Sequence, residues 1–365
     1  MSATRSQRLQ KSFLKYQHVF VFAAPALFVA LVLLAAPTGG SGGLDYWLEY
    51  WWLFPFFLLG ATIVNTVGIS GSALFVPFLI FIFPLLAHPL EPETLVKVGL
   101  ISESFGLSSS SIAFIQYGLV DRRLALTIVA GSVPFVIGGA LLSFFIPEPL
   151  FHAALGAALL AAGFLMLKAD ISHGEPDEDS EAVSTDGGER VDLPDDDGKL
   201  GPAGVDATDG EVTRVDRGGD TYRYSWSGYL ERFANYSVGG TFQGLAGFGS
   251  GELGIISQLR TGVPTRVAIG TNHIIVATTA ILASLVHVFG GTILGAFGVG
   301  GVHSLSLAST PWNMVVFTVP ATVTGGQIAP YVSNALDTGT IQKGVAVLFG
   351  LISTALFLMA SGAGI

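Results

Sequence analysis

Long apolar stretches make up most of the chain, and polar residues, glycine and proline separate them. A helix needs about 20 mainly apolar residues to cross a bilayer. Stretches of about this length predict helices at 19–36, 94–117, 122–146 and 149–168, and again near 266–289, 311–333 and 340–360. The pattern therefore predicts an all-α polytopic membrane protein.

Two further apolar blocks, 51–86 and 226–259, are interrupted by glycine-rich breaks near 68–71 and 244–254. Each glycine inside a helix costs about 1 kcal/mol of helix propensity relative to alanine. Lipid offers no hydrogen-bond partner to an opened backbone, so such a break has to face protein or a wet cavity. We expect each block to be a broken helix or a helical hairpin that lines a site. Whether the blocks span fully or are re-entrant is left open, and close helix packing by small residues is the alternative.

The two halves of the chain carry similar landmarks in the same order. Alignment of Gly71 with Gly251 superposes the two breaks, and a Val-Pro pair precedes a Gly-Gly pair in both halves, at 133–139 and at 319–326. Repetition of this kind indicates a duplicated unit. Two broken helices in corresponding places are typical of the binding site of a secondary transporter.

Lysine and arginine indicate which ends of the helices face the cytoplasm. If residue 1 is cytoplasmic and 51–86 is a hairpin, five basic residues fall on the cytoplasmic side: Arg122, Arg123, Arg260, Arg266 and Lys343. The two halves are then inverted relative to each other. A single crossing by 51–86 would instead place the arginines at 122 and 123 outside. We expect 19–36 to be a retained helix that follows a cytoplasmic N-terminus, with a signal peptide as the alternative.

Charge divides the chain further. Only 12% of the residues are charged and half are hydrophobic, which is typical of a membrane protein. Residues 170–220, however, hold 17 acidic and four basic residues, a local charge of −13 against +3 for the remainder. We therefore expect an N-terminus with a first transmembrane helix (1–50), membrane repeat 1 (51–168), an acidic disordered cytoplasmic loop (169–225) and membrane repeat 2 (226–365). The acidic balance argues against nucleic-acid binding.

Candidate chemistry centres on the two breaks. The N-terminal end of a helix offers free N–H groups and a positive dipole end, and it binds anions without a basic side chain. We expect a small anion to bind at the breaks and their polar neighbours, at Gly68, Ser70, Gly71, Ser72, Gly247, Gly249, Ser250, Gly251, Thr271 and Asn272. Coordination of Na⁺ by the unwound carbonyl groups is the alternative.

Three ionisable residues lie within apolar stretches, where a charge is costly and a functional role is the default hypothesis. They are Glu103, Glu252 and His273. Glu103 and His273 occupy nearly equivalent places in the two halves, so a proton relay between them is one interpretation. The other is that each is held by a hydrogen bond to a neighbouring helix.

Other chemistries find little support in the sequence. Cysteine is absent, which excludes disulfides, thiolate metal sites and cysteine nucleophiles. Motifs of hydrolases, metalloproteases and nucleotide-binding enzymes are also missing. His287 and His303 flank a glycine-rich loop and could bind a metal, although two lone histidines usually do not. We therefore expect a protein that is not an enzyme, with no cofactor and no metal.

With both breaks in place, the chain resembles the sulfite exporter TauE/SafE family of membrane permeases. The resemblance covers 55–360 without the acidic loop, and it rests on four short motifs at 68–77, 117–123, 247–251 and 264–271. Ser70 and Ser72 stand where family members often have glycine, and Ser257 replaces the proline of the second repeat. These departures concern which anion is carried.

The resemblance implies a multi-pass permease of the cell (cytoplasmic) membrane. Members are associated with the movement of small sulfur-containing anions, such as sulfite or sulfonates. We expect export of such an anion by alternating access at a midplane site, with proton coupling, and with the bilayer and the anion as partners. A membrane-embedded sensor or scaffold that recruits a cytosolic partner through the acidic loop is the alternative. The identity of the anion, the direction, the coupling ion and a homo-oligomeric state are left open.

Overall fold

The computed structural model describes residues 5–37, 43–116, 120–173, 205–208, 211–215, 221–224, 226–263, 265–298, 306–335 and 338–361. Most of these residues are helical. The helices are α1 (Arg5–Ala35), α2 (Leu44–Leu48), α3 (Leu53–Val67), α4 (Ser72–Phe81), α5 (Pro92–Gln116), α6 (Arg122–Leu142), α7 (Glu148–His173), α8 (Trp226–Ala246), α9 (Ser250–Arg260), α10 (Thr265–Ala296), α11 (Trp312–Ala335) and α12 (Thr338–Ala360), with short 3₁₀ turns at Phe83–Leu85 and Ser143–Phe145.

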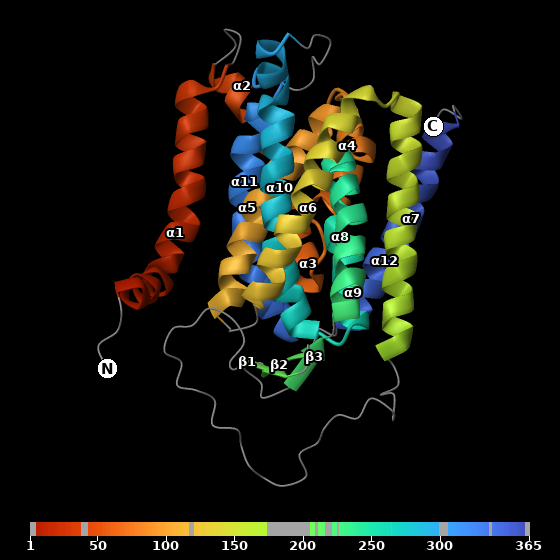
Figure 1. Cartoon of the computed structure of the whole chain (residues 1–365). Coiled ribbons are helices and arrows are strands. Elements are labelled where there is room, and N and C mark those ends of the chain that lie inside the picture. Colours follow the sequence, from red (N-terminus) through yellow and green to blue (C-terminus); the bar gives the residue numbers. More distant parts are fainter. Residues whose placement is uncertain are drawn as a thin grey trace.

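The helices form one upright bundle, with α1 standing apart on one side and the pair α7 and α12 on the other (Figure 1). In the centre α5 packs against α10 and α11, α3 packs against α11, and α6 packs against α8. The N-terminus lies towards the lower end of the bundle in this view and the C-terminus at the upper end. Segments from both halves of the sequence are thus interleaved in the core.

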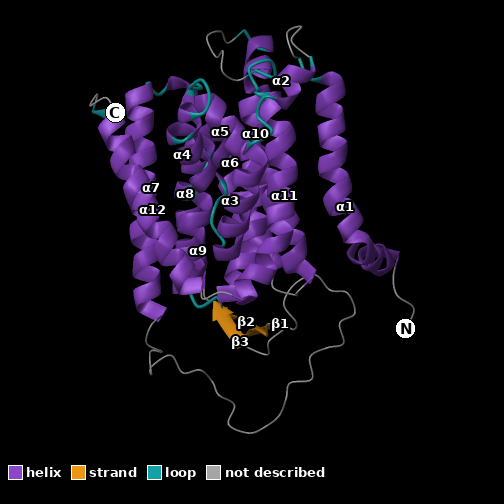
Figure 2. Ribbon diagram, turned by 180° about the vertical axis from the view of Figure 1, so that it is seen from behind, coloured by secondary structure: helices purple, strands orange, loops and turns teal. Residues whose placement is uncertain are grey.

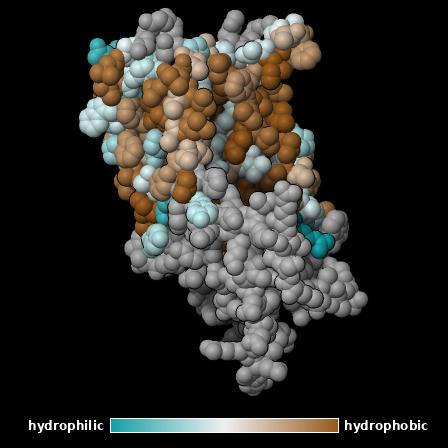
Figure 3. Space-filling model, turned by 90° about the vertical axis from the view of Figure 1, so that its left-hand side faces the viewer, coloured by the Kyte–Doolittle hydropathy of each residue, from teal (hydrophilic) through white to brown (hydrophobic). Residues whose placement is uncertain are grey.

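Helix length and surface agree with the predicted membrane protein. Within the described residues, four helical segments are long and apolar enough to cross a membrane: Leu44–Val67, Thr94–Ile115, Arg122–Phe145 and Val267–Ala296. Large apolar side chains cover the upper part of the face shown in Figure 3. Among the described residues, Leu34, Leu85 and Phe297 are strongly exposed, and lipid rather than water suits such a surface.

Both apolar blocks are broken where the glycines predicted it. In the first, α3 ends at Gly68, which has a φ of 79°, and α4 begins four residues later. In the second, α8 gives way to α9 through Gly247 and Gly249, which have φ of 89° and 124°. Positive φ is accessible to glycine because it has no Cβ to clash with the backbone. Glycine therefore ends the first arm of each block.

Other glycines serve close packing, which was the alternative interpretation. A Cβ added to Gly139 of α6 would lie 2.0 Å from the Thr241 carbonyl oxygen of α8. One added to Gly325 of α11 would lie 2.8 Å from the Leu58 carbonyl oxygen of α3. These glycines let two pairs of helices touch backbone to backbone.

The acidic loop contains an antiparallel sheet, orange in Figure 2. Its strands β1 (Val205–Thr208), β2 (Glu211–Val215) and β3 (Thr221–Tyr224) lie side by side in chain order. The prediction of disorder over 169–225 is therefore wrong for these strands, and α7 also continues to His173. The prediction of disorder was based on the abundant acidic residues and gave too little weight to the β-branched and aromatic residues, which favour strands. Residues 174–204 lie outside the described part.

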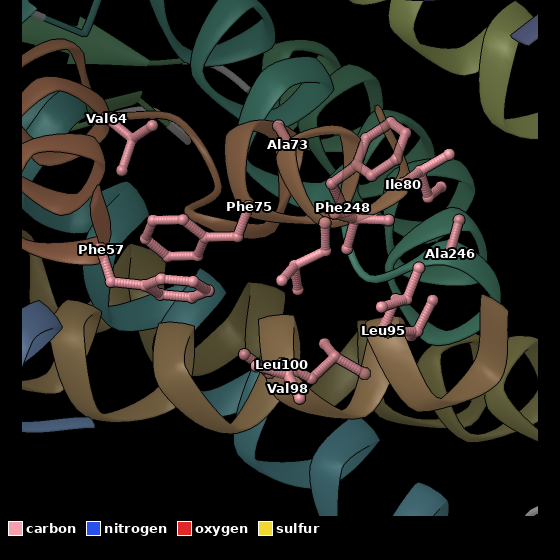
Figure 4. Packing of buried hydrophobic residues seen from close by; sticks show 14 of the residues in the cluster. Phe57, Val64, Ala73, Phe75, Ile80, Leu95, Val98, Leu100, Ala246 and Phe248 are labelled. Atoms are coloured by element: carbon pink, nitrogen blue, oxygen red, sulfur yellow. The ribbon is translucent and has the colours of Figure 1, made fainter. Parts of the chain in front are cut away.

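The apolar core surrounds the first break. Phe57 of α3 and Phe75 of α4 stack with ring centroids 4.3 Å apart, which joins the two arms of the first block. Figure 4 shows Phe248, from the second break, among side chains of the first block and of α5. The core therefore holds the two breaks near each other.

Candidate functional site

The two helix breaks meet in the middle of the bundle. The amide nitrogen Nδ2 of Asn272, on α10, donates to the carbonyl oxygens of Gly68 and Gly251 at 2.8 and 3.0 Å. A Cβ added to Gly251 would lie only 2.8 Å from the backbone nitrogen of Ser70. The Asn272 side chain thus connects the two breaks, and the absence of a side chain at Gly251 lets them come into contact.

The carboxylate of Glu252 bridges the two breaks. Its Oε1 accepts a hydrogen bond from the backbone N–H of Ser70 at 3.0 Å, and its Oε2 accepts one from the N–H of Gly249 at 2.8 Å. Gly249 is the N-cap of α9, where the N–H groups of the first turn have no partner inside the helix. The carboxylate therefore occupies the position in which a helix N-terminus binds an anion.

Glu103, on α5, occupies the corresponding position at α4. Its Oε2 accepts hydrogen bonds from the backbone N–H of Ser72, at 3.1 Å, and from the Ser72 hydroxyl. Its Oε1 accepts a longer bond, 3.4 Å, from the side-chain amide of Gln243 on α8. Glu103 and Glu252 therefore accept from backbone N–H groups only two residues apart, those of Ser72 and Ser70. The Ser70 hydroxyl makes no hydrogen bond within the described residues.

The site is closed to both faces of the bundle in this conformation. Glu252, Asn272 and the serines at 70, 72 and 250 are completely buried, and Glu103 is 1% exposed. The hydroxyl of Ser250, at the start of α9, makes no hydrogen bond within the described part of the chain. A buried hydroxyl without a partner at a helix N-terminus is a polar group that a ligand can satisfy.

Most of the predicted binding residues lie at the two breaks, but Thr271 and Gly71 make other contacts. Gly247 lies beside the first break, since an added Cβ would be 3.3 Å from the Ser72 side chain. Thr271 accepts a hydrogen bond from the backbone N–H of Asp121 at 2.9 Å and so positions the start of α6. Gly71 faces the Phe75 ring of its own helix, 2.8 Å from an added Cβ.

The predicted Glu103–His273 relay is not the pairing that the fold makes. His273 Nδ1 lies 2.9 Å from the Ser110 hydroxyl, and its ring packs edge-on against Phe114. Ser110 is seven residues beyond Glu103 on α5, or about two helical turns. Glu252 is instead the ionisable group that the first break brings near Glu103, because the two carboxylates accept from the N–H groups of Ser70 and Ser72.

Two polar residues at the site were missed from the sequence. Tyr236 donates its hydroxyl to Asn272 Oδ1 at 2.5 Å, and Gln258 donates its side-chain amide to the Tyr236 hydroxyl at 2.5 Å. Tyr236 and Gln243 are seven residues apart and therefore share one face of α8. That spacing of polar residues in an apolar helix is the signal that could have found Tyr236.

No group of three or more His, Cys, Asp or Glu side chains within the described residues could hold a metal ion. Two carbonyl groups at the breaks, those of Gly68 and Gly251, accept from the Asn272 amide. The backbone N–H groups of Ser70, Ser72 and Gly249 point at oxyanions, which here are the carboxylates of Glu252 and Glu103.

Comparison with known proteins identifies the family of the chain. Residues 53–356 match the family described as Sulfite exporter TauE/SafE. The chain belongs to the sulfite exporter TauE/SafE family. The family match begins at the start of α3 and ends in α12, so it includes both breaks and excludes α1.

A curated relative has a corresponding description. The chain is 23% identical over 300 residues to the "Probable membrane transporter protein YunE" of Bacillus subtilis (strain 168), which covers 81% of this chain and 92% of the relative. No solved structure matches the chain. The TauE/SafE family, this relative and the apolar helices together identify a multi-pass membrane transporter.

Proposed function

We propose that the protein carries a small oxyanion, such as sulfite or an organosulfonate, across the cytoplasmic membrane by alternating access at the two breaks. One observation supports this most directly: the backbone N–H groups of Ser70, Ser72 and Gly249 converge on carboxylate oxygens at 2.8 to 3.1 Å. A carboxylate is itself a small oxyanion. Backbone that holds its oxygens in this way is suited to the oxygens of a sulfite or sulfonate group.

Helix pairing supports two inverted repeats. The first broken block packs through α3 against α11, and the second packs through α8 against α6. Because α6 and α11 hold the same place in the two halves, each block packs against the corresponding helix of the other half. In Figure 1 α4 lies in the upper part of the bundle and α9 in the lower part. Inverted repeats place two such breaks on a pseudo-two-fold axis at the centre of the membrane.

The charge pattern supports a cytoplasmic position for the lower end of the bundle in Figure 1. The three-stranded sheet of the acidic loop lies at that end, as does the N-terminus. The basic residues Arg122, Arg123 and Arg260 begin α6 and end α9, and all three precede or follow connections at this end. Lysine and arginine are enriched on cytoplasmic connections. The loop at 169–225 would then be cytoplasmic.

The two buried carboxyl groups are the proposed coupling residues. An oxyanion bound to the N–H groups would add a third negative charge beside Glu103 and Glu252, in a completely buried place. Such a cluster is strongly unfavourable unless at least one carboxyl takes up a proton. A proton would then travel with the anion. His273 is a second, separate coupling candidate, because its Nε2 is buried without a hydrogen-bond partner in the described residues.

Reconstitution tests the proposal. Purified protein in liposomes is offered radiolabelled sulfite, an organosulfonate, sulfate or thiosulfate, with protein-free liposomes as the control. We expect saturable uptake of at least one sulfur oxyanion that the control lacks. Protein that elutes as a single species in detergent yet moves none of these anions would rule out the proposed substrate class.

A further inference from the structure

The N–H groups proposed to hold the anion already have hydrogen-bond acceptors in this closed conformation. Glu252 takes those of Ser70 and Gly249, and Glu103 takes that of Ser72. We infer that these two carboxylates are the carrier's own substitute for its substrate, which fill the site whenever no anion is bound and so allow the unloaded carrier to close and return. The inference rests on the proposed function and deepens it.

Closure without such a substitute would be costly. Ser70, Ser72 and Gly249 are buried, and a buried N–H without a partner costs about 1–3 kcal/mol. Three of them would oppose closure of an unloaded site. A bound oxyanion removes that cost in the loaded carrier, and the carboxylates remove it in the unloaded one. Both cannot use the same N–H groups, so the substrate has to displace the carboxylates.

Each carboxylate also reaches from one half of the chain to the other. Glu252 lies on α9, in the second half, and takes the N–H of Ser70 in the first. Glu103 lies on α5, in the first half, and takes the amide of Gln243 in the second. An oxyanion between the breaks would make the same cross-connection. The carboxylates therefore replace its bridging role as well as its charge.

A carrier of this kind has two modes of flux that depend differently on the carboxylates. Net flux requires the unloaded carrier to return, whereas exchange of one anion for another uses loaded carriers in both directions. Glutamine offers one acceptor oxygen and one NH₂ donor where glutamate offers two acceptors. Glu252→Gln therefore cannot accept from Ser70 and Gly249 together, and the return of the unloaded carrier should suffer most.

The experiment compares the two modes in proteoliposomes. Net flux is the uptake of radiolabelled sulfite into vesicles without internal sulfite, with the membrane potential clamped. Exchange is the same uptake into vesicles loaded with unlabelled sulfite. For Glu252→Gln and Glu103→Gln we expect net flux to fall by about tenfold or more and exchange by no more than about threefold. The matched control is Glu231→Gln, at a partly exposed glutamate paired with Arg260 at 3.2 Å, which should keep the wild-type ratio.

Equal loss of both modes in the two variants would overturn the inference, because a merely structural cap supports both modes alike. It would leave the proposed function intact as long as the wild type moves sulfite. Sulfite transport in neither mode by the wild type would instead count against the proposed function.

A measurement on the wild type covers the case in which the variants do not fold. Sulfite binding to the purified protein should shift a carboxylate stretching band in its infrared difference spectrum, because bound sulfite displaces the carboxylates from the backbone. Sulfite binding without any change in that band would overturn the inference.

Discussion

The backbone N–H of Ser70 donates to the carboxylate of Glu252 across 3.0 Å, although the two residues are 182 positions apart in the chain. The bond joins the first helix break to the helix that follows the second. Gly251, next to Glu252, leaves no room for even a Cβ beside Ser70. The two glycine-rich breaks therefore form one site.

Gly251→Leu should abolish transport. Its Cβ would lie 2.8 Å from the Ser70 backbone nitrogen and 2.9 Å from the Ser70 hydroxyl, so the breaks would be forced apart and the site filled. We expect sulfite uptake to fall by at least about tenfold, with a loss of stability of about 1–3 kcal/mol that leaves assembly largely intact. Gly350→Leu, at a position with open space around its Cβ, is the control. Wild-type uptake by the Gly251 variant would remove this residue from the site.

Glu103→Gln should flatten the pH dependence of transport. If a proton travels with the anion, uptake rises as the pH on the side of the anion falls, and a neutral side chain at this position removes one of the two buried carboxyl groups. Initial rates of sulfite uptake between about pH 5 and about pH 8 measure the slope. The same slope in wild type and variant would show that Glu103 has no part in coupling.

Asn272→Leu should destabilise the protein more than Tyr236→Phe does. The asparagine amide donates to both breaks, and its loss removes these two hydrogen bonds and leaves the Tyr236 hydroxyl without an acceptor. We expect about 2–4 kcal/mol for Asn272→Leu and about 1–2 kcal/mol for Tyr236→Phe. Unfolding followed in detergent micelles compares the two, and equal losses would contradict the central position of Asn272.

Neighbouring glycines of α6 should respond in opposite directions to alanine. Gly139→Ala places a methyl group 2.0 Å from the Thr241 carbonyl oxygen and should lower stability by more than about 1 kcal/mol. Gly138 has nothing within 4 Å of an added Cβ, so Gly138→Ala should raise stability by up to about 1 kcal/mol through helix propensity. The melting temperatures of the two variants provide the check. A tolerated Gly139→Ala would mean that α6 and α8 are not in backbone contact.

Replacement of residues 175–218 by a Gly/Ser linker of equal length should leave sulfite flux close to that of the wild type. The breaks and every helix of the family match lie outside this segment. Flux in proteoliposomes is the measure. Retention of the protein in the membrane with complete loss of activity would favour the sensor or scaffold interpretation instead.

Local features of the sequence predicted much of this architecture. Glycine in an apolar block has few roles, so breaks near 68–71 and 244–254 followed from the residue types alone. The structure places the second one at Gly247 and Gly249. Buried ionisable residues were equally visible, and Glu103 and Glu252 both lie at the site.

The partners of these residues could not be predicted in the same way. Which face of α10 meets the breaks depends on its rotation in the bundle, so the sequence paired Glu103 with His273 although the fold brings Glu252 to it. Gln258 was missed for the same reason, since a hydrogen bond between helices leaves no local signal. For Tyr236 the only local signal was its spacing from Gln243 on α8. The strands at 205–224 were missed because composition averages conceal a few strand-forming residues.

The glycine contacts of α6 and α11 restrict how such a carrier can move. Each contact seats the first arm of a broken block on a long helix from the opposite half, without side chains between them to slide or repack. The two halves are therefore interlocked, and neither can move outward as an independent unit. If the protein works by alternating access, we expect the pairs α6–α8 and α3–α11 to move as units against α5 and α10, which pack on each other between them.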